Sequence, residues 1–554
     1  MSPEKQLELS ASYDFIVCGG GTAGCVVARR LADDPAARVL LLEAGGDERI
    51  DAVRNATQWM SNIGSSRDWR FEAEPSPALL GRRPALPAGK VLGGGSSING
   101  LIWARGHKDD FDRWAEETGD PGWSYASVLE TYKRIESWDG PQDPARRGRE
   151  GPVYVTRPRN PVPLTFALID AAAAAGIPAV EDLNGAAMEG AGGCGIPNVT
   201  VKEGRERVSM AGAYLRPAMM RPNLTVLLDA EVRRLLIEGS RVTGVEFAAG
   251  GGTRQVRADC EVILSLGAIH TPKILMLSGI GDERELRRHG IAPVQHLAGV
   301  GRNFQDHVLV AGCVWEYQTP EAPRNNSAEF TFFCKSDASL PTPDLQPMLE
   351  ECAFGSELTR LRYDLPGNPA AAWTLAPGLV RPHSRGFVAL TGGSPQHPVA
   401  VHANFLRDPR DVQALMRAVA LCREIGNSPR LQAFVRREIM PGPLGPEEME
   451  EWLRRASGSY FHPACTAKMG RDAMSVVDGS LCVYGVRGLR IADASVMPAI
   501  TTGNTMAPCV MIGERAAELA LRAHRSAGPR WPASCVPRSY VPPADNPLPQ
   551  GNSP

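Results

Sequence analysis

Short apolar runs that stop at glycines recur along the chain, and they predict buried strands of a parallel sheet. The first run, residues 13–18, leads into the glycine-rich segment GGGTAG and a helical pattern that ends at about residue 32. A second run, ARVLLLEAGG, follows this helix. Strand, helix and strand in this order predict a βαβ unit, because buried parallel strands are apolar throughout and need a helical crossover.

The pattern changes twice further along the chain. Residues 206–310 contain alternating strands with a turn at Glu238–Arg241, and then an apolar strand that feeds a helix. Residues 151–205 and 311–460 mix strand and helix patterns without βαβ units. We therefore predict one α/β domain from residues 12–150, 206–310 and 461–526, an α+β domain from the two remaining segments, and a proline-rich tail over residues 527–554.

Length and charge limit the classes of protein to which the chain can belong. A chain of 554 residues exceeds what one hydrophobic core usually serves. Its 60 basic and 62 acidic residues show no basic stripe, which argues against a nucleic-acid partner. No apolar run approaches the ~18 residues of a membrane span. The first residues lack a secretory pattern, and 12 scattered cysteines without a CxxC motif favour a reducing, cytoplasmic setting over a disulfide framework.

The first βαβ unit carries a dinucleotide-binding pattern. Gly19, Gly21 and Gly24 form G-x-G-x-x-G around Thr22 and Ala23, between the strand and the helix. Glu43, followed by Ala44, ends the second strand 19 residues after Gly24. Such glycines allow a diphosphate to approach the helix N-terminus, and such an acid can accept hydrogen bonds from ribose hydroxyls. The pattern predicts an ADP-containing cofactor, either NAD or FAD.

Four further motifs carry a family resemblance. They are GKVLGGGSSING (89–100), GAIHTPKILMLSGIG (267–281), GVGRNFQDH (299–307), and the C-terminal pair HPACTAKMG and LRIADASVMPAITTGNTMAPCVMIGERAAE. With these motifs the chain resembles the glucose–methanol–choline (GMC) flavin oxidoreductases from about residue 14 to residue 522. The resemblance implies a Rossmann-like FAD-binding domain, a discontinuous antiparallel-sheet substrate domain, and FAD-dependent oxidation of an alcohol to an aldehyde or ketone.

The resemblance also implies which residues contact FAD. The glycine-rich motif brings backbone amides to the flavin, and we expect the hydroxyls of Ser96 and Ser97 to add donors. Some family members tether the flavin through a histidine, but Ile98 stands at that position here, so we predict non-covalent FAD. Val232 is expected near the adenine. The remaining implied contacts are Val91, Gly93, Gly94, Ser97, Asn99, Gly100, Asp493, Ala494, Asn504 and Thr505.

His462 and Asn504, 42 residues apart, match the catalytic pair of the family. As hydride leaves the alcohol carbon, a base must take the hydroxyl proton, and a neutral histidine suits that role. The amide NH₂ of Asn504 can donate to the developing alkoxide. We expect Tyr460 and Phe461 to line the substrate pocket. His307 is interpreted as structural packing near the cofactor.

The segment SYFHPACTAKMG also allows other interpretations. His462 and Cys465 could form half of a metal site or a nucleophile pair, but no second ligand cluster or orienting group is visible, so no metal is expected. Met506 stands where many relatives carry asparagine, which predicts a local change in packing or flavin contact.

Two alternative activities remain open. One is a hydroxynitrile lyase on the same scaffold, and the other is a nicotinamide-dependent dehydrogenase that uses only the first βαβ unit. For the favoured activity the predicted partners are a small alcohol and an electron acceptor, either oxygen or a quinone-like compound.

Overall fold

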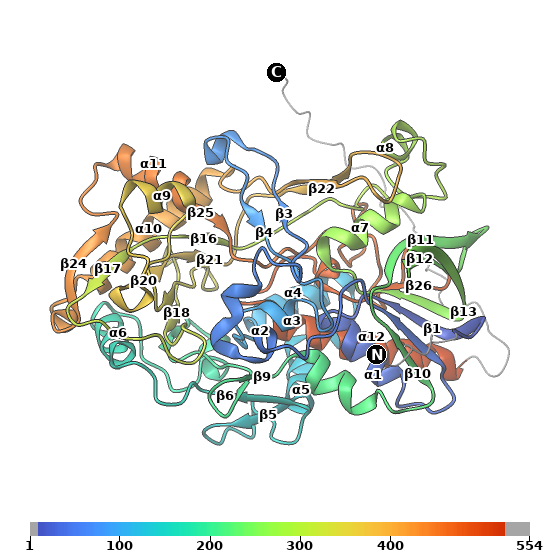
Figure 1. Cartoon of the computed structure of the whole chain (residues 1–554), viewed down its shortest axis with the longest axis horizontal. Helices are drawn as coiled ribbons and strands as arrows, with labels where there is room; N and C mark the ends of the chain where they lie inside the picture. The colour runs from blue at the N-terminus through green and yellow to red at the C-terminus, as the bar shows by residue number, and fades with distance from the viewer. Residues whose placement is uncertain (1–8, 527–554) are drawn as a thin grey trace.

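The computed structural model describes residues 9–526, so the predicted proline-rich tail lies outside the described residues. Two large sheets lie at opposite ends of the long axis in Figure 1, with the glycine-rich segments between them. The sheet at the right is mainly parallel and the sheet at the left is antiparallel.

The first sheet has seven strands in the order β10-β2-β1-β13-β12-β11, with β26 paired to β13. The predicted βαβ unit is confirmed, because β1 and β2 pair in parallel and helix α1 connects them along the chain. The long strand β13 changes partners along its length: its first half is antiparallel to β12, and its second half is parallel to β1 and β26. The bounds are β1 (Ser12–Cys18), β2 (Val39–Leu42), β10 (Leu224–Leu227), β11 (Glu231–Glu238), β12 (Arg241–Ala249), β13 (Gly252–Leu264) and β26 (Leu489–Ile491).

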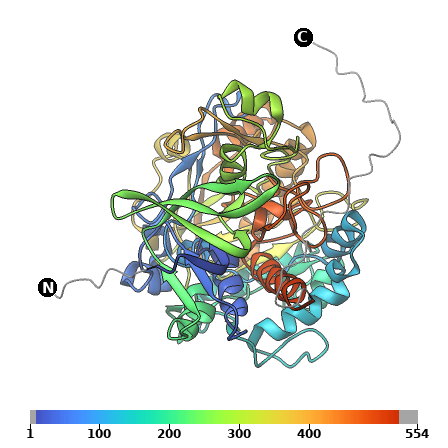
Figure 2. The ribbon, with the colours of Figure 1, turned by 90° about the vertical axis from the view of Figure 1, so that its right-hand side faces the viewer.

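Two helices pack together beside this sheet. Figure 2 shows the molecule from the end that carries the sheet. Helix α1 (Thr22–Leu31) contacts α12 (Met506–Ser526), although nearly the whole chain separates them. Arg30 forms an ion pair of 2.9 Å with Glu514, and the hydroxyl of Tyr214 donates to the same carboxylate. Because α12 starts directly after Asn504 and Thr505, this packing fixes the C-terminal catalytic segment against the N-terminal glycine motif.

The second sheet has six antiparallel strands in the order β24-β17-β20-β19-β18-β7. Strand β7 comes from the 151–205 segment and the other five come from 311–460, which agrees with a discontinuous antiparallel domain. The domain boundaries themselves stay predictions. The bounds are β7 (Gly193–Gly195), β17 (Val314–Tyr317), β18 (Thr331–Phe333), β19 (Met348–Glu350), β20 (Ala372–Ala376) and β24 (Val435–Met440).

A small sheet that the sequence pattern did not predict joins the two regions. Strand β16 (Val308–Val310) lies between β21 (Gly378–Leu379) and β25 (Ser457–Ser459), with antiparallel pairing on both sides. Strand β16 ends at the predicted boundary at residue 310, and β21 and β25 belong to the segment 311–460, so their pairing joins the two predicted domains. The β16–β25 pairing matters most for function, because it brings the end of the GVGRNFQDH motif beside SYFHPACTAKMG.

Further helices and strands complete the described fold. Helix α4 begins at Lys108, and Ser124 is the N-cap residue of α5. The bounds are α3 (Gly95–Ile98), α4 (Lys108–Thr118), α5 (Tyr125–Ile135), β6 (Val153–Thr156), α6 (Pro163–Ala174), α7 (Gly267–Leu277), β22 (Phe387–Leu390), β23 (Val399–His402), α10 (Pro409–Gly426) and α11 (Pro446–Ala456). None of the helices between residues 9 and 526 is long and apolar enough to cross a membrane.

Candidate active site

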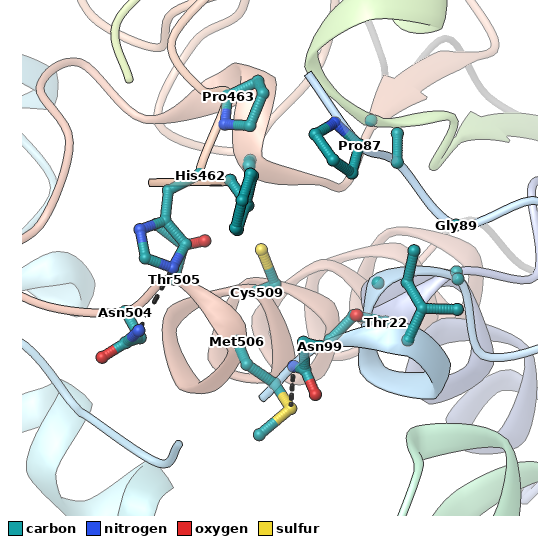
Figure 3. A pocket seen from close by; sticks show the side chains of 18 of the residues that line it. Thr22, Pro87, Gly89, Asn99, His462, Pro463, Asn504, Thr505, Met506 and Cys509 are labelled. Carbon is teal, nitrogen blue, oxygen red and sulfur yellow. Dashed lines mark hydrogen bonds between the residues drawn. The ribbon is translucent and has the colours of Figure 1, made fainter. Parts of the chain in front are cut away.

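A cavity of about 300 Å³ lies where the glycine-rich segments meet the end of strand β25. The structure brings most of the predicted site residues to its wall, and Figure 3 shows several of them around one opening. The predicted residues on the wall are Gly19, Gly21, Thr22, Ala23, Glu43, Ala44, Gly94, Asn99, Gly100, Tyr460, Phe461, His462, Asp493, Ala494, Asn504 and Thr505.

Six predicted cofactor residues do not reach this wall. Val232 borders a smaller adjacent cavity, and Gly24, Val91, Gly93, Ser96 and Ser97 are not among the lining residues. The hydroxyl of Ser97 donates to the carbonyl of Leu92 at 2.6 Å, and that of Ser96 donates to Gly93 at 2.6 Å. The two hydroxyls that were expected to donate to the flavin therefore form hydrogen bonds within the glycine-rich turn, and they stabilise that turn.

Two glycine segments form the floor of the cavity. Gly21 caps helix α1 without a side-chain hydrogen bond, so the amides of the first turn are open to a ligand. Gly94 has a φ of +52°, and a Cβ at Gly94 would lie 2.7 Å from the Cα of Gly21. Only glycine allows these two segments to touch. A helix N-terminus enclosed by bare backbone fits the diphosphate of FAD.

Two buried acids hold this floor together. Glu43 accepts hydrogen bonds from the backbone amides of Gly20 (2.8 Å) and Gly45 (2.7 Å), and burial raises the pKa of Glu43 to about 7. Asp493 accepts from the amide of Gly267 at 2.9 Å and from the hydroxyl of Thr271 at 2.6 Å, at the start of α7. Each carboxylate thus fixes a turn and also lines the cavity.

The cavity also holds polar groups that fit a cofactor. Ser265 lines the wall, and its buried hydroxyl has no hydrogen-bond partner among the described residues. Asn99 donates to the sulfur of Met506 at 3.1 Å, and its own oxygen accepts from Arg207 at 2.9 Å. Met506 thus contacts a residue of the glycine-rich motif, as Figure 3 shows. Ile98 lines the cavity with an aliphatic side chain.

His462 lies at the other end of the cavity and is held by a second histidine. The Nδ1 atoms of His462 and His307 are 3.0 Å apart, and Nε2 of His307 is 3.0 Å from the carbonyl oxygen of Thr501. Two backbone pairings fix this approach, because the amide of Tyr460 donates to the carbonyl of His307, and Gln305 pairs with Ala464. The pairing of segments some 150 residues apart therefore sets the distance between the two rings.

These contacts determine where the protons lie. A carbonyl oxygen only accepts, so Nε2 of His307 carries a hydrogen and donates to Thr501. In a neutral ring Nδ1 is then an acceptor, and Nδ1 of His462 must be the donor in the contact between the two histidines. Nε2 of His462 is left unprotonated, 3.2 Å from the amide nitrogen of Asn504. Burial lowers the pKa of His462 to about 3, which keeps the ring neutral.

Asp306 and Gln346 form hydrogen bonds that position His462 and Asn504. Asp306 accepts from the backbone amide of His462 at 2.9 Å and from the hydroxyl of Ser459, and burial raises the pKa of Asp306 to about 7. The side chain of Gln346 donates to the oxygen of Asn504 at 2.9 Å. Since that oxygen accepts, the Asn504 NH₂ faces Nε2 of His462.

Cys465 takes no part in this arrangement. It does not line the cavity, it is fully buried, and desolvation raises the pKa of its thiol well above the ordinary value. Residues 9–526 contain no group of three or more His, Cys, Asp or Glu side chains placed to hold a metal ion. Neither the nucleophile nor the metal interpretation finds support in the described residues.

Sequence analysis missed several residues of the site. His307 was interpreted as packing, whereas it contacts the predicted base directly. Gln346 and Glu350 carry no motif, although Glu350 stands out as an acid in an apolar strand. For His307 the available signal was the neighbouring Asp306: two polar residues directly before the apolar run 308–311 suggest a strand end near a site.

Comparisons with known proteins agree with this geometry. The sequence profiles of the N- and C-terminal GMC oxidoreductase domains match residues 13–309 and 382–513. The chain is 38% identical to an oxygen-dependent choline dehydrogenase of Sinorhizobium medicae, over 91% of this chain and 95% of that protein. It is 36% identical to the mitochondrial choline dehydrogenase of Mus musculus, over 92% and 89% of the two chains.

Solved structures show the same similarity. Pyridoxine 4-oxidase from Mesorbium loti superposes with a TM-score of 0.87 at 31% identity, over 93% of this chain and 99% of the other. A formate oxidase superposes with a TM-score of 0.83 at 26% identity, over 94% and 100%. The chain therefore belongs to the GMC oxidoreductase family and is an FAD-dependent enzyme that oxidises the CH–OH group of an alcohol.

Proposed function

We propose that His462 is the general base of this oxidation and that Asn504 binds the substrate oxygen. The observation that carries the proposal is the unprotonated Nε2 of His462, which lies beside the Asn504 NH₂ on the wall of the cavity that also contains the glycine cradle. Nε2 takes the hydroxyl proton. The second hydrogen of the Asn504 amide donates to the oxygen as negative charge develops on it.

FAD, when bound, accepts the hydride from the alcohol carbon. The residues suited to hold it are the two glycine segments around Gly21 and Gly94, with Glu43 and Asp493 on either side. We propose that FAD is held without a covalent bond, because Ile98 has no atom that could form one. Precipitating the protein with acid should leave the flavin in the supernatant, and a yellow pellet would contradict this.

The chemistry is tested by adding alcohols to the anaerobic protein. Oxidised flavin should bleach with at least one alcohol, because the base and the oxygen-binding amide are already in place. Flavin that stays oxidised while a cyanohydrin releases cyanide would select the lyase alternative, to which the relatives named above give no support. Protein purified without flavin would contradict the proposal.

The electron acceptor is tested in the same cuvette. Rapid return of the yellow colour on admitting air identifies oxygen as an acceptor, and a colour that returns only with a quinone identifies a dehydrogenase. A cytoplasmic location stays a prediction.

A further inference from the structure

Arg207 is a buried arginine whose described partners are all uncharged. It lies in strand β9 (Glu206–Arg207) and is 7% exposed. Its guanidinium donates to the backbone carbonyls of Val53 at 2.8 Å and Ser96 at 3.1 Å, and to the side-chain oxygen of Asn99 at 2.9 Å. Its Nη2 atom has no hydrogen-bond partner among the described residues. The guanidinium therefore lacks an anionic partner within the part of the chain that the structure describes.

Other buried arginines of the chain differ in this respect. Arg105 and Arg490 each form an ion pair with a buried glutamate. Glu206, which precedes Arg207, is exposed and pairs with Arg54 at the surface. Burial lowers the pKa of Arg207 to about 9, so the guanidinium remains charged at neutral pH. An uncompensated buried charge is costly, and it points to an anionic group that binds close by.

Arg207 is connected to the cavity through Asn99. The side-chain oxygen of Asn99 accepts from Arg207 and also from the backbone amide of Leu101 at 3.1 Å. Because this oxygen is occupied from outside the cavity, the NH₂ group of Asn99 faces inward, where one N–H donates to the sulfur of Met506 (Figure 3). The second N–H has no acceptor among the described residues and is available to a ligand.

The position of Asn99 indicates which part of FAD this ligand is. Asn99 directly follows Ile98, which stands where some family members tether the flavin, and both residues line the cavity. Arg207 does not line the cavity, so its charge is separated from the cofactor side by the Asn99 side chain alone. The contact between Arg207 and Ser96 holds the same glycine-rich motif from a second point.

The wall of the cavity supplies no cation of its own. Among the described residues that line it, three are acidic and none is lysine or arginine. FAD adds the negative charges of its diphosphate, and a hydride adds one more when the flavin accepts it. A buried cation behind the wall would stabilise this last charge, because charges near a flavin tune its reduction potential.

We infer that Arg207 is a positioning residue that acts on the cofactor: it holds the Asn99 NH₂ towards the flavin and raises the reduction potential of the bound FAD. This inference goes beyond the proposed function, because the potential depends neither on His462 nor on the alcohol.

The test measures the midpoint potential of the purified FAD enzyme by reductive titration against reference dyes, without alcohol. Arg207→Gln retains an N–H donor for Asn99 but has no charge, and the equilibrium constant for reduction should fall about tenfold, which is about 30 mV for a two-electron couple. Arg207→Lys retains the charge and should keep a potential close to that of the parent. Arg82→Met is the control, because Arg82 also donates to backbone carbonyls, those of Arg454 and Ser457, and none of these residues lines the cavity.

A second variant is Asn99→Asp, which keeps the contact with Arg207 but neutralises its charge. It should also lower the potential, and it tests the inference if Arg207→Gln does not fold. Equal potentials in the parent, Arg207→Gln and Asn99→Asp would overturn the inference. A potential lowered in Arg207→Lys but not in Arg207→Gln would overturn it as well, because the hydrogen bond and not the charge would then matter. Weaker FAD binding at an unchanged potential would leave Arg207 with a purely structural role. A parent enzyme that no alcohol reduces would contradict the proposed function and not this inference.

Discussion

The Nδ1 atoms of His307 and His462 are 3.0 Å apart, and only one of the two can carry the shared hydrogen. The Thr501 carbonyl decides which, because it requires the hydrogen of His307 at Nε2. The order of donors then continues from Asn504 to His462, from His462 to His307 and from His307 to the backbone. A backbone carbonyl on the far side of His307 thus selects the basic nitrogen that faces the cavity.

Replacing His307 should therefore slow proton removal without loss of substrate binding. In His307→Leu the Nδ1 hydrogen of His462 loses its acceptor, and the ring is free to turn or to exchange tautomers. We expect flavin reduction to slow by about 10- to 100-fold with little change in KM, measured by anaerobic stopped flow. His307→Gln retains an acceptor oxygen and should recover part of the rate. Equal rates in the leucine variant and the parent would remove His307 from this positioning role.

The catalytic pair gives a second prediction. His462→Ala should retain FAD and lose at least about 10² in the rate of flavin reduction, because no other described group lies at the position of Nε2. Asn504→Leu should lose a comparable factor by removing the donor to the developing alkoxide. A reduction rate of His462→Ala within about threefold of the parent would exclude His462 as the general base.

The contact between Gly21 and Gly94 gives a third prediction. Gly94→Ala introduces a Cβ 2.7 Å from the Gly21 Cα at a φ of +52°, so the two segments must separate. FAD affinity should fall by about tenfold or more, seen as flavin loss on dilution and gel filtration. Gly46→Ala is the control, because a Cβ there would meet no atom within 4 Å. Equal flavin retention in both variants would contradict the proposed cradle.

The buried carboxyl of Glu350, which lines the cavity, should lower stability at high pH. Its pKa is about 8 in the folded state and near the ordinary value of 4.5 in the unfolded chain. Between these values the folded state binds the extra proton, so its contribution to stability falls as the pH rises and is lowest above about 8. Glu350→Gln should therefore have a higher Tm than the parent at alkaline pH and a similar Tm near the unfolded pKa. A lower Tm of the variant at every pH would contradict this account.

Local pattern predicted the parts of the site that lie within one segment. The G-x-G-x-x-G turn and the acid at Glu43 follow from spacing and apolar periodicity. Asp493, His462 and Asn504 follow from the family resemblance. Gly19, Gly21, Glu43 and these three residues line the same cavity.

The missed residues depend on how distant segments pair. His307 reaches His462 only because Val308 pairs with Ser459 in the small sheet, and a shift of one residue would turn the side chains to opposite faces. Glu350 was visible as an acid in the strand Met348–Glu350. Its alternation with Leu349 does not say which face meets the cavity, since both faces of this strand are buried.

The hydrogen bond from Gln346 to Asn504 couples the position of the substrate-pocket wall to the position of the catalytic pair. Gln346 lies two residues before strand β19, whose Met348 and Glu350 line the cavity. Directed evolution of residues 346–350 towards new alcohols will therefore alter turnover together with selectivity. Libraries that hold Gln346 fixed should yield active variants more often than libraries that include it.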